Sequence, residues 1–204
     1  MLQKRGIMEN LFNYISIEKF KERRYKRKEV IHAEGEKCNE FSVVLSGQVL
    51  ISTFTETERE YAINILGSGN TFGELLLFSN FDCYLGNIIA VRDTTILSIS
   101  KQELLNELAR NPEFMKEFIE LISSEAMALQ TRNKILLQSS IRDRILFYLN
   151  ERKKIESSNA FYIDSKESLA RYLNIPRPSL SRELIAMQND KLISYGKHYI
   201  KLEN

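Results

Sequence analysis

The distribution of glycine divides the chain into two parts that favour different secondary structure. Six of the eight glycines lie between Gly35 and Gly86, whereas no glycine or proline occurs between Pro112 and Pro176. Glycine supplies the tight turns that join short strands, and its absence over a long stretch favours helix. We therefore expect an α+β chain with a β-rich N-terminal part and a helical C-terminal part.

Residues 28–99 carry short runs of β-branched and aromatic residues that are separated by turn residues. The clearest runs are residues 43–45, 48–54, 61–66, 88–91 and 95–97. Runs of this length and spacing predict a sandwich or barrel of short strands.

The next segment has the signals of two helices. Ser100 and the acid three residues later form a capping box, which predicts a short helix that ends at Arg110. Asn111 can cap a second helix, with Pro112 in its first position. If this helix continues to Gln138, it is about 40 Å long.

An apolar stripe near heptad spacing runs along the second helix. Its members are Phe114, Phe118, Leu121, Ile122, Leu129 and Leu136. The stripe either packs on its own domain or pairs with the same helix of a second subunit. The length of the helix favours the dimer, although Glu125, Arg132 and Asn133 interrupt the stripe.

Residues 164–184 have the pattern of a helix–turn–helix. Ser165 can cap the first helix, and Ala170 is small enough for the second helix to cross closely. Asn174 stands at the turn, where a residue that tolerates a left-handed backbone is needed. The second helix starts near Arg177.

At about 100° per residue, one side of the second helix lies opposite the apolar Leu180 and Leu184. This side carries Pro178, Ser181 and Arg182, and the long side chain of Arg177 can reach it. Arginine donates two hydrogen bonds to guanine, and serine bonds bases or phosphates. We therefore predict that Arg177, Ser181 and Arg182 contact bases; the alternative is a helical hairpin with an arginine-bearing solvent face.

Phosphate contacts are predicted for four further residues, namely Ser165, Lys166, Ser179 and Lys197. Lys197 and His198 stand near the tip of a terminal hairpin, residues 191–201, that has the pattern of a β-wing. Residues 141–204 contain 12 Lys/Arg against 8 Asp/Glu, whereas residues 1–140 contain 17 against 19. This small basic excess supports a nucleic-acid contact in the C-terminal part.

Several classes of protein are excluded by what the sequence lacks. No apolar run is long enough for a membrane-spanning helix, and the N-terminus has no pattern of a signal peptide, so we expect a cytoplasmic protein. Cys38 and Cys83 have no metal-ligand spacing, which argues against a zinc or iron–sulfur site. With His32 and His198 as the only histidines, we expect neither a metal site nor catalytic residues, and hence no enzyme.

Three segments of the N-terminal part, residues 30–36, 41–49 and 72–75, resemble the strand–glycine motifs and the Phe-Gly-Glu-Leu motif of one family. Together with the helix–turn–helix, they make the chain similar to the cyclic AMP receptor/FNR (Crp/Fnr) family of bacterial transcription regulators. The resemblance implies a cyclic-nucleotide-binding-like β-roll, a kind of jelly roll, over residues 1–110. It further implies a dimerisation helix over residues 111–138 and a winged helix–turn–helix DNA-binding domain over residues 139–204.

The chain departs from the nucleotide-binding members of that family. In those members an Arg-Ser or Arg-Thr pair binds the cyclic phosphate, but the matching positions here are Tyr84 and Leu85. The Thr-Ser pair that meets the base aligns with Leu129 and Gln130. A buried phosphate without a cation is costly, so we predict no cyclic AMP binding. We also predict no other cofactor.

The effector pocket implied by the resemblance comprises Gly73, Glu74, Leu75, Tyr84, Leu85, Leu129 and Gln130. Three states of this pocket stay open: empty, filled by apolar side chains such as Tyr84, Leu85 and Phe81, or adapted to an unknown small-molecule effector. Relatives carry a base-reading Glu where this chain has Pro178, so the DNA site should differ from theirs.

The sequence therefore predicts a homodimeric, sequence-specific DNA-binding transcription regulator that does not respond to cyclic AMP. Its expected partners are double-stranded DNA, a second copy of the chain and RNA polymerase. The alternative is a small-molecule-binding β-roll sensor whose helical tail mediates protein contacts.

Overall fold

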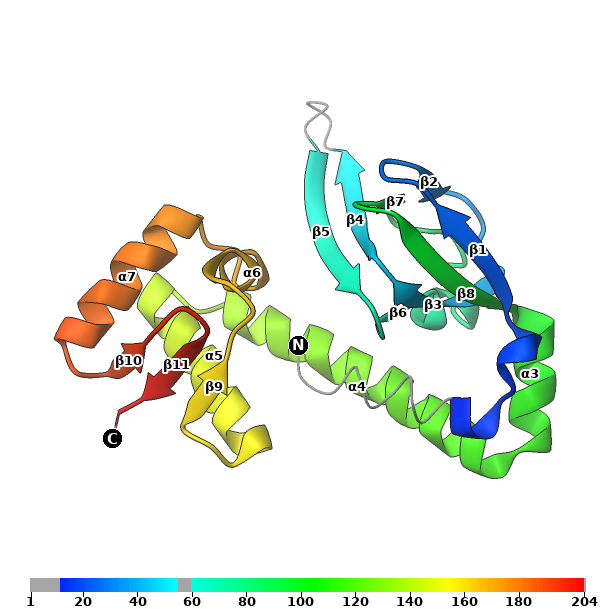
Figure 1. The fold of residues 1–204 in the computed structure, drawn as a ribbon. Helices are drawn as coiled ribbons and strands as arrows, with labels where there is room; N and C mark the ends of the chain where they lie inside the picture. The colour runs from blue at the N-terminus through cyan, green and yellow to red at the C-terminus, as the bar shows by residue number, and fades with distance from the viewer. Residues whose placement is uncertain (1–11, 55–59, 204) are drawn as a thin grey trace. The chain divides into compact units, whose positions relative to one another are not determined.

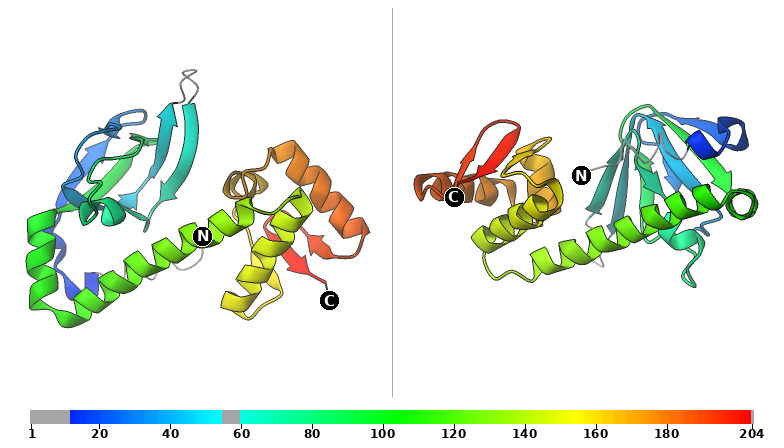
Figure 2. Two further views of the ribbon diagram at one scale, coloured as in Figure 1. Left: turned by 180° about the vertical axis from the view of Figure 1, so that it is seen from behind. Right: turned by 90° about the horizontal axis from the view of Figure 1, so that it is seen from below.

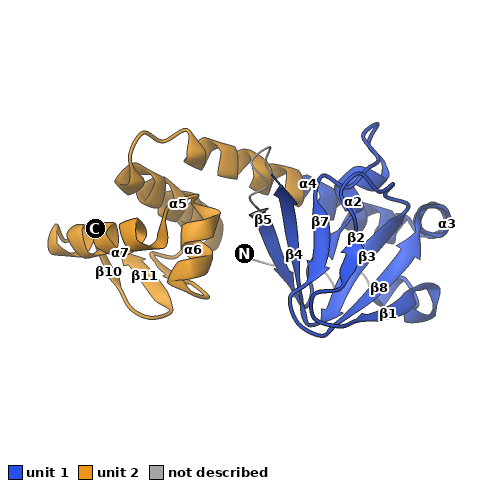
Figure 3. Cartoon of the chain, turned by 90° about the horizontal axis from the view of Figure 1, so that it is seen from above, with its two compact units in different colours: residues 1–123 blue, residues 124–204 orange. Residues whose placement is uncertain are grey.

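The structure is a computed structural model that describes residues 12–54 and 60–203. The N-terminal segment on which the prediction of no signal peptide depends lies outside these residues. The chain forms two compact units, shown in Figure 3, with unit 1 ending at Ser123 and unit 2 beginning at Ser124. No helix in the described ranges is both long and apolar enough to cross a membrane.

Unit 1 is a roll of two four-stranded antiparallel sheets (Figure 1). One sheet has the order β1 (Lys21–Tyr25), β8 (Thr94–Ser100), β3 (Glu40–Ser46) and β6 (Thr71–Phe72). The other has the order β2 (Val30–His32), β7 (Asn87–Ala90), β4 (Gln48–Phe54) and β5 (Glu60–Gly67). The views from behind and below in Figure 2 show the two sheets curving around a common interior.

The core of unit 1 lies between these sheets. Val43 and Val44 of β3 and Val49 of β4 are fully buried, and Ile88 of β7 is 2% exposed. The turn from β3 to β4 requires Gly47, whose φ is +92° and whose Cβ, if present, would lie 2.5 Å from the Asp93 carbonyl oxygen. Because Val43 and Val44 are neighbours on β3 and point to opposite faces, both faces of this strand are covered.

Three elements of unit 1 were not predicted from the sequence. They are β1, the 3₁₀ helix η1 (Ile17–Lys19) and the short helix α2 (Glu74–Leu77). The polar strand β1 forms because it pairs with β8 from Lys21↔Ser98 to Tyr25↔Thr94 at the edge of the sheet. Backbone pairing, and not an apolar pattern, fixes this strand.

Helices α3 (Lys101–Arg110) and α4 (Pro112–Leu136) follow the roll. The Ser100 hydroxyl accepts a hydrogen bond from the Glu103 amide at 3.3 Å, as the capping box predicted. Asn111 caps α4, since its Oδ1 accepts from the Phe114 amide at 3.2 Å. The predicted fold class, a β-roll followed by helices, is confirmed.

The predicted single stripe on α4 is wrong, because its members lie on two faces. Phe114, Phe118 and Leu121 are at most 3% exposed and pack into the core of unit 1. A second stripe with true heptad spacing is at least partly exposed. It comprises Met115, Ile119, Ile122, Ala126, Leu129, Asn133 and Leu136.

Unit 2 combines the C-terminal part of α4 and three further helices with a three-stranded antiparallel sheet of order β10-β11-β9 (Figure 1). Its elements are α5 (Ile141–Glu156), β9 (Ala160–Tyr162), α6 (Lys166–Tyr172), α7 (Arg177–Asn189), β10 (Ile193–Tyr195) and β11 (Tyr199–Leu202). Its core contains the fully buried Ile145, Leu173 and Leu180.

One charged side chain, Arg152 of α5, is also buried in unit 2. Its guanidinium donates to the Glu156 carboxylate at 2.6 Å, to the Tyr148 hydroxyl at 3.0 Å and to the Tyr162 carbonyl at 2.8 Å. These bonds offset the cost of removing the charge from water. Arg152 therefore ties α5 to β9.

Candidate nucleic-acid interface

The helix–turn–helix is built by local hydrogen bonds that the sequence predicted. The Ser165 hydroxyl accepts from the Ser168 amide at 3.0 Å and caps α6. Asn174 has a φ of +53° in the turn, and the Ile175 amide donates to the Ala170 carbonyl at 2.9 Å. This left-handed residue redirects the chain so that α7 starts at Arg177.

Helix α7 has one buried side and one solvent side. Leu180, Leu184 and Met187 are fully buried. Arg177, Pro178 and Arg182 are exposed, and Ser179 and Ser181 are half-buried. Of the three predicted base-contacting residues, Arg177 and Arg182 are thus open to solvent and Ser181 is partly so.

The N-terminus of α7 carries no negative charge of its own. No acid lies in its first turn, and no side chain caps the helix at Pro176. The amides of a first turn and the positive end of the helix dipole both attract phosphate. This end of α7 therefore presents only groups that suit a polyanion.

Glu183 of α7 and Asp190, the residue that follows α7, both pair with Arg142 of helix α5. The Arg142 Nε donates to Glu183 Oε1 at 2.7 Å, and its Nη1 forms an ion pair with Asp190 Oδ2 at 2.7 Å. The hydrogen bond to Glu183, followed by that to Asp190, raises the pKa of Arg142. Arg142 thus fixes α7 along its length and removes free negative charge beside Arg182, a role that the sequence did not reveal.

The predicted phosphate contacts differ in how the fold engages them. Ser165 is used as the cap of α6, and the Lys166 ammonium lies 4.4 Å from the centre of the Tyr195 ring. The Ser179 hydroxyl accepts a hydrogen bond from Arg182 at 3.4 Å. Lys197 is exposed in the turn between β10 and β11.

The wing contains an ordered histidine. The His198 Nδ1 donates to the Asp164 carbonyl at 3.1 Å, and its ring stacks with Tyr162 at a centroid distance of 6.0 Å. These contacts tie the β10–β11 turn to the segment before α6. The wing and the helix–turn–helix are therefore held together within unit 2.

Arg177 of α7 has an acidic partner that the sequence did not indicate. The Glu167 carboxylate of α6 forms ion pairs with Arg177 Nε at 3.5 Å and with Arg171 Nη2 at 3.9 Å. Only the three-dimensional crossing of α6 and α7 brings these side chains together, so no local pattern could have indicated it.

In unit 1, Gly73 and Glu74 of the predicted effector pocket have structural roles. Gly73 has a φ of +91°, and a Cβ there would lie 2.6 Å from the Glu40 carbonyl oxygen. The buried Glu74 carboxylate accepts a hydrogen bond from the Thr71 hydroxyl at 3.2 Å. Leu75 is 37% exposed at the start of α2.

The remaining predicted pocket residues differ in burial. Of the apolar side chains that could fill the pocket, Tyr84 is buried, whereas Leu85 is 58% and Phe81 is 61% exposed. Leu129 and Gln130 are exposed on the part of α4 that belongs to unit 2.

A charged network surrounds the buried His32 ring, on which Tyr84 stacks. The His32 ring forms ion pairs with Glu36 through Nδ1 at 2.8 Å and with Glu40 through Nε2 at 3.5 Å, and Arg23 also pairs with Glu40. Burial raises the pKa of Glu40, but bonds from His32 and Arg23 outweigh it and hold the pKa at about 2. Burial lowers the pKa of His32, yet bonds to Glu40 and Glu36 leave it raised.

No group of three His, Cys, Asp or Glu residues in the described part of the chain could hold a metal ion.

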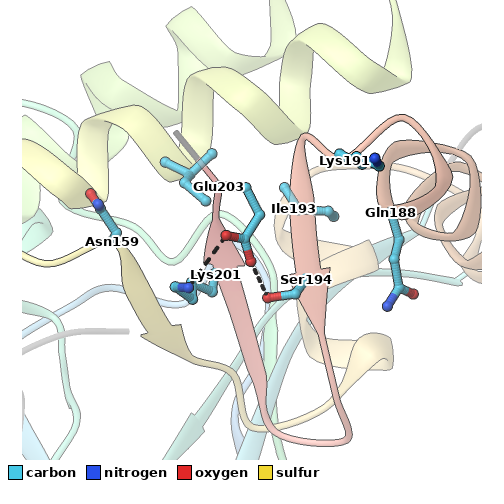
Figure 4. Close-up of a pocket in the computed structure, with 8 residues that line it drawn as sticks. Asn159, Gln188, Lys191, Ile193, Ser194, Lys201 and Glu203 are labelled. Atoms are coloured by element: carbon cyan, nitrogen blue, oxygen red, sulfur yellow. Dashed lines mark hydrogen bonds and ion pairs between the residues drawn. The ribbon is translucent and has the colours of Figure 1, made fainter.

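Unit 2 has an open pocket beside the sheet (Figure 4). It is lined by the end of α7 and by β10 and β11. The Glu203 carboxylate lies over it and accepts hydrogen bonds from Ser194 at 2.7 Å and from Lys201 at 3.3 Å. The acid that lines this pocket is therefore paired within unit 2.

Comparison with known proteins agrees with this architecture. The family model of the cyclic nucleotide-binding domain matches residues 22–111. The chain is 24% identical over 196 residues to the anaerobic regulatory protein of Bacillus subtilis, which covers 89% of this chain and 82% of that protein. It is 22% identical over 182 residues to the cyclic AMP receptor protein of Thermus thermophilus, which covers 89% and 83%.

Solved structures show the same fold. A CooA mutant from Carboxydothermus hydrogenoformans superposes with a TM-score of 0.69 at 18% identity, covering 97% of this chain and 91% of that one. The roll, the long helix and the winged helix–turn–helix therefore occur in the same order as in these regulators. The resemblance seen in the sequence is confirmed: over most of its length the chain is similar to transcription regulators of the Crp/Fnr family.

Proposed function

We propose that this protein is a homodimeric, sequence-specific DNA-binding transcription regulator in which each subunit places α7 in a major groove. The observation that carries the proposal is the polar side of α7. Arg177 and Arg182 are exposed there, opposite the fully buried Leu180 and Leu184. A helix held by its apolar side and free on its basic side can enter a groove without unfolding.

Arg177, Ser181 and Arg182 are the proposed base-reading residues. An arginine fork can donate to the O6 and N7 atoms of guanine, and each such pair discriminates by about 1–3 kcal/mol. The exposed Pro178 has no hydrogen-bonding group, so it contributes contact with a base edge only. The preferred DNA site should therefore contain guanines opposite the first two turns of α7.

Phosphate contacts come from Lys166, Ser179, Lys197 and the region of Ser165 in this proposal. Lys166 and Lys197 carry the charges that displace counterions from DNA. The apparent binding constant should fall with salt, with a logarithmic slope of about −0.9 for each phosphate neutralised. These contacts orient the protein on the duplex and carry no sequence information themselves.

The exposed stripe of α4 supports dimer formation. In heptad terms, Met115, Ile122, Leu129 and Leu136 occupy d positions, and Ile119, Ala126 and Asn133 occupy a positions. Leu129 is 50% and Ile119 is 55% exposed within one subunit, which leaves apolar surface to be covered. A second copy of α4 covers it, and twofold symmetry then places two half-sites about 34 Å apart.

The roll is proposed not to respond to cyclic AMP. No lysine or arginine occurs between Glu74 and Arg92, and Tyr84, at the position of the phosphate-binding arginine, is buried against His32. The residues present therefore do not fit a cyclic phosphate. Calorimetry with cyclic AMP should give no binding heat, and tight binding would contradict this part of the proposal.

As a transcription regulator the protein would act in the cytoplasm and contact RNA polymerase. The experiment that tests the proposed function selects DNA fragments from a genomic pool, with and without cell metabolites. We expect recovery of an inverted repeat in the absence of added ligand. Equal recovery of all sequences at every moderate salt concentration would contradict DNA recognition and favour a sensor whose helical tail contacts proteins.

A further inference from the structure

We infer that Glu167 is a positioning residue that holds Arg177 for guanine recognition and lowers its affinity for phosphate. The inference rests on the proposed function, because it concerns how α7 discriminates between DNA sequences. It starts from the ion pair between Glu167 Oε2 and Arg177 Nε at 3.5 Å. Both side chains are about equally open to solvent, at 59% and 61% exposure.

The ion pair engages the guanidinium at one position only. Arginine has five N–H donors in a fixed planar fork, one on Nε and four on the two terminal nitrogens. The recorded ion pair uses Nε, which is the donor nearest the backbone. Both terminal nitrogens stay available to donate to O6 and N7 of one guanine, so Glu167 can orient Arg177 while Arg177 reads a base.

Helix α7 provides no other means of fixing Arg177. Pro176 stands at its N-cap position without a side-chain bond, and its first turn contains no acid. The hydroxyl of Ser179, in the same turn, accepts instead from Arg182. Among the ion pairs of the described residues, Glu167 is the only acid that Arg177 contacts.

The carboxylate also opposes the wrong binding mode. On DNA without the correct base, Arg177 would gain most by turning to a phosphate, which requires it to leave Glu167. Glu167 would then keep only the longer, 3.9 Å pair with Arg171 and would face the polyanion. Correct readout keeps the ion pair intact, whereas phosphate binding breaks it, so the charge of Glu167 favours the specific complex.

The test is a double-mutant cycle on Glu167→Gln and Arg177→Ala. Affinity is measured for the duplex that the wild-type protein selects from random oligonucleotides and for a random duplex of equal length. The control is Glu120→Gln, which removes the same charge from an exposed site on α4 in unit 1. Thermal unfolding of each variant checks that the fold is retained.

We expect Glu167→Gln to lower the preference for the selected duplex about tenfold, partly through tighter binding to random DNA. A tenfold change corresponds to about 1.4 kcal/mol. In the Arg177→Ala background the same substitution should change the preference by less than twofold, and Glu120→Gln should leave it unchanged.

Two results would overturn the inference. Glu167→Gln could strengthen binding to both duplexes by an equal factor, which would reduce Glu167 to a general repulsive charge. Alternatively, it could lower the preference equally with and without Arg177, which would separate its effect from the ion pair. Failure of the proposed function looks different, because the wild-type protein itself would then show no preference for any duplex.

Discussion

The Tyr84 ring lies flat on the His32 ring, with centroids 4.4 Å apart and planes inclined by 20°. Tyr84 is 3% exposed, so this stack is part of the core of unit 1. The residue at the position that binds a phosphate in nucleotide-binding relatives therefore contributes to packing here. Unit 1 thus matches the cyclic nucleotide-binding domain while it carries a core aromatic residue at this position.

Replacing this ring should weaken unit 1 without altering DNA recognition. We expect Tyr84→Ala to lower the free energy of unfolding by about 3–5 kcal/mol, because it removes a buried aromatic ring and leaves a cavity. Tyr84→Phe retains the ring and serves as the matched control. The measurement is urea unfolding, and equal stability of the alanine variant and the wild type would show that the stack contributes nothing.

The network around His32 predicts how the stability of unit 1 depends on pH. The pKa of Glu40 is about 2 in the folded protein and 4.5 in its ordinary state, so its contribution is complete above pH 4.5 and is lost as pH falls towards 2. The pKa of His32 is raised above 6.5, so its contribution is complete below pH 6.5 and is lost as pH rises through the higher value. Glu36 and Glu40, which contact the ring, favour its charge, whereas burial opposes it.

We therefore expect maximal stability of the network between about pH 4.5 and 6.5. Urea unfolding at pH 5.5 and pH 8.5 checks this expectation. His32→Gln should abolish most of the loss in the free energy of unfolding between pH 5.5 and pH 8.5. If the variant loses as much stability over this range as the wild type, other groups cause the loss.

Arg142 should be needed to hold α7 in place. Arg142→Ala removes the ion-pair partner that Glu183 and Asp190 share, and it leaves their two carboxylates near the proposed DNA-facing side. We expect a small loss of stability and a fall in affinity for all DNA sequences. Gel-shift titration measures the affinity; Arg24→Ala, which removes an exposed pair with Glu22 in unit 1, should not change it.

The dimer face can be tested with two neighbouring residues of α4. Leu129 lies on the exposed heptad stripe, whereas Met127, which is 59% exposed, lies off it. We expect Leu129→Glu to produce monomers in sedimentation experiments, because it places like charges in the seam. Met127→Glu should remain dimeric; if both variants dimerise normally, α4 is not the interface.

The sequence predicted the helix–turn–helix well because its signals are local. The cap at Ser165, the left-handed residue Asn174 and the spacing of Leu180 and Leu184 each act within one or two turns. The same holds for the cap at Ser100. Local hydrogen bonds and helical periodicity need no knowledge of the rest of the fold.

Features that depend on distant segments were missed. The strand β1 is polar and is fixed by pairing with β8, which lies more than seventy residues later in the Lys21↔Ser98 register. Arg142 meets Glu183 only because α5 crosses α7, and Glu167 meets Arg177 only because α6 does. On α4, Leu121 and Ile122 are neighbours in sequence, so periodicity alone merged a core face and an exposed face into one stripe.

The central claim is that two copies of α7 read DNA, and footprinting of the selected duplex tests it most directly. We predict protection of an inverted repeat with half-site centres about 34 Å apart. Arg182→Ala should relax base preference within each half-site by about 1–3 kcal/mol while the protein stays folded. An unprotected duplex, or an equal loss of affinity on every sequence in the Arg182→Ala variant, would contradict the account of α7 as the base-reading helix.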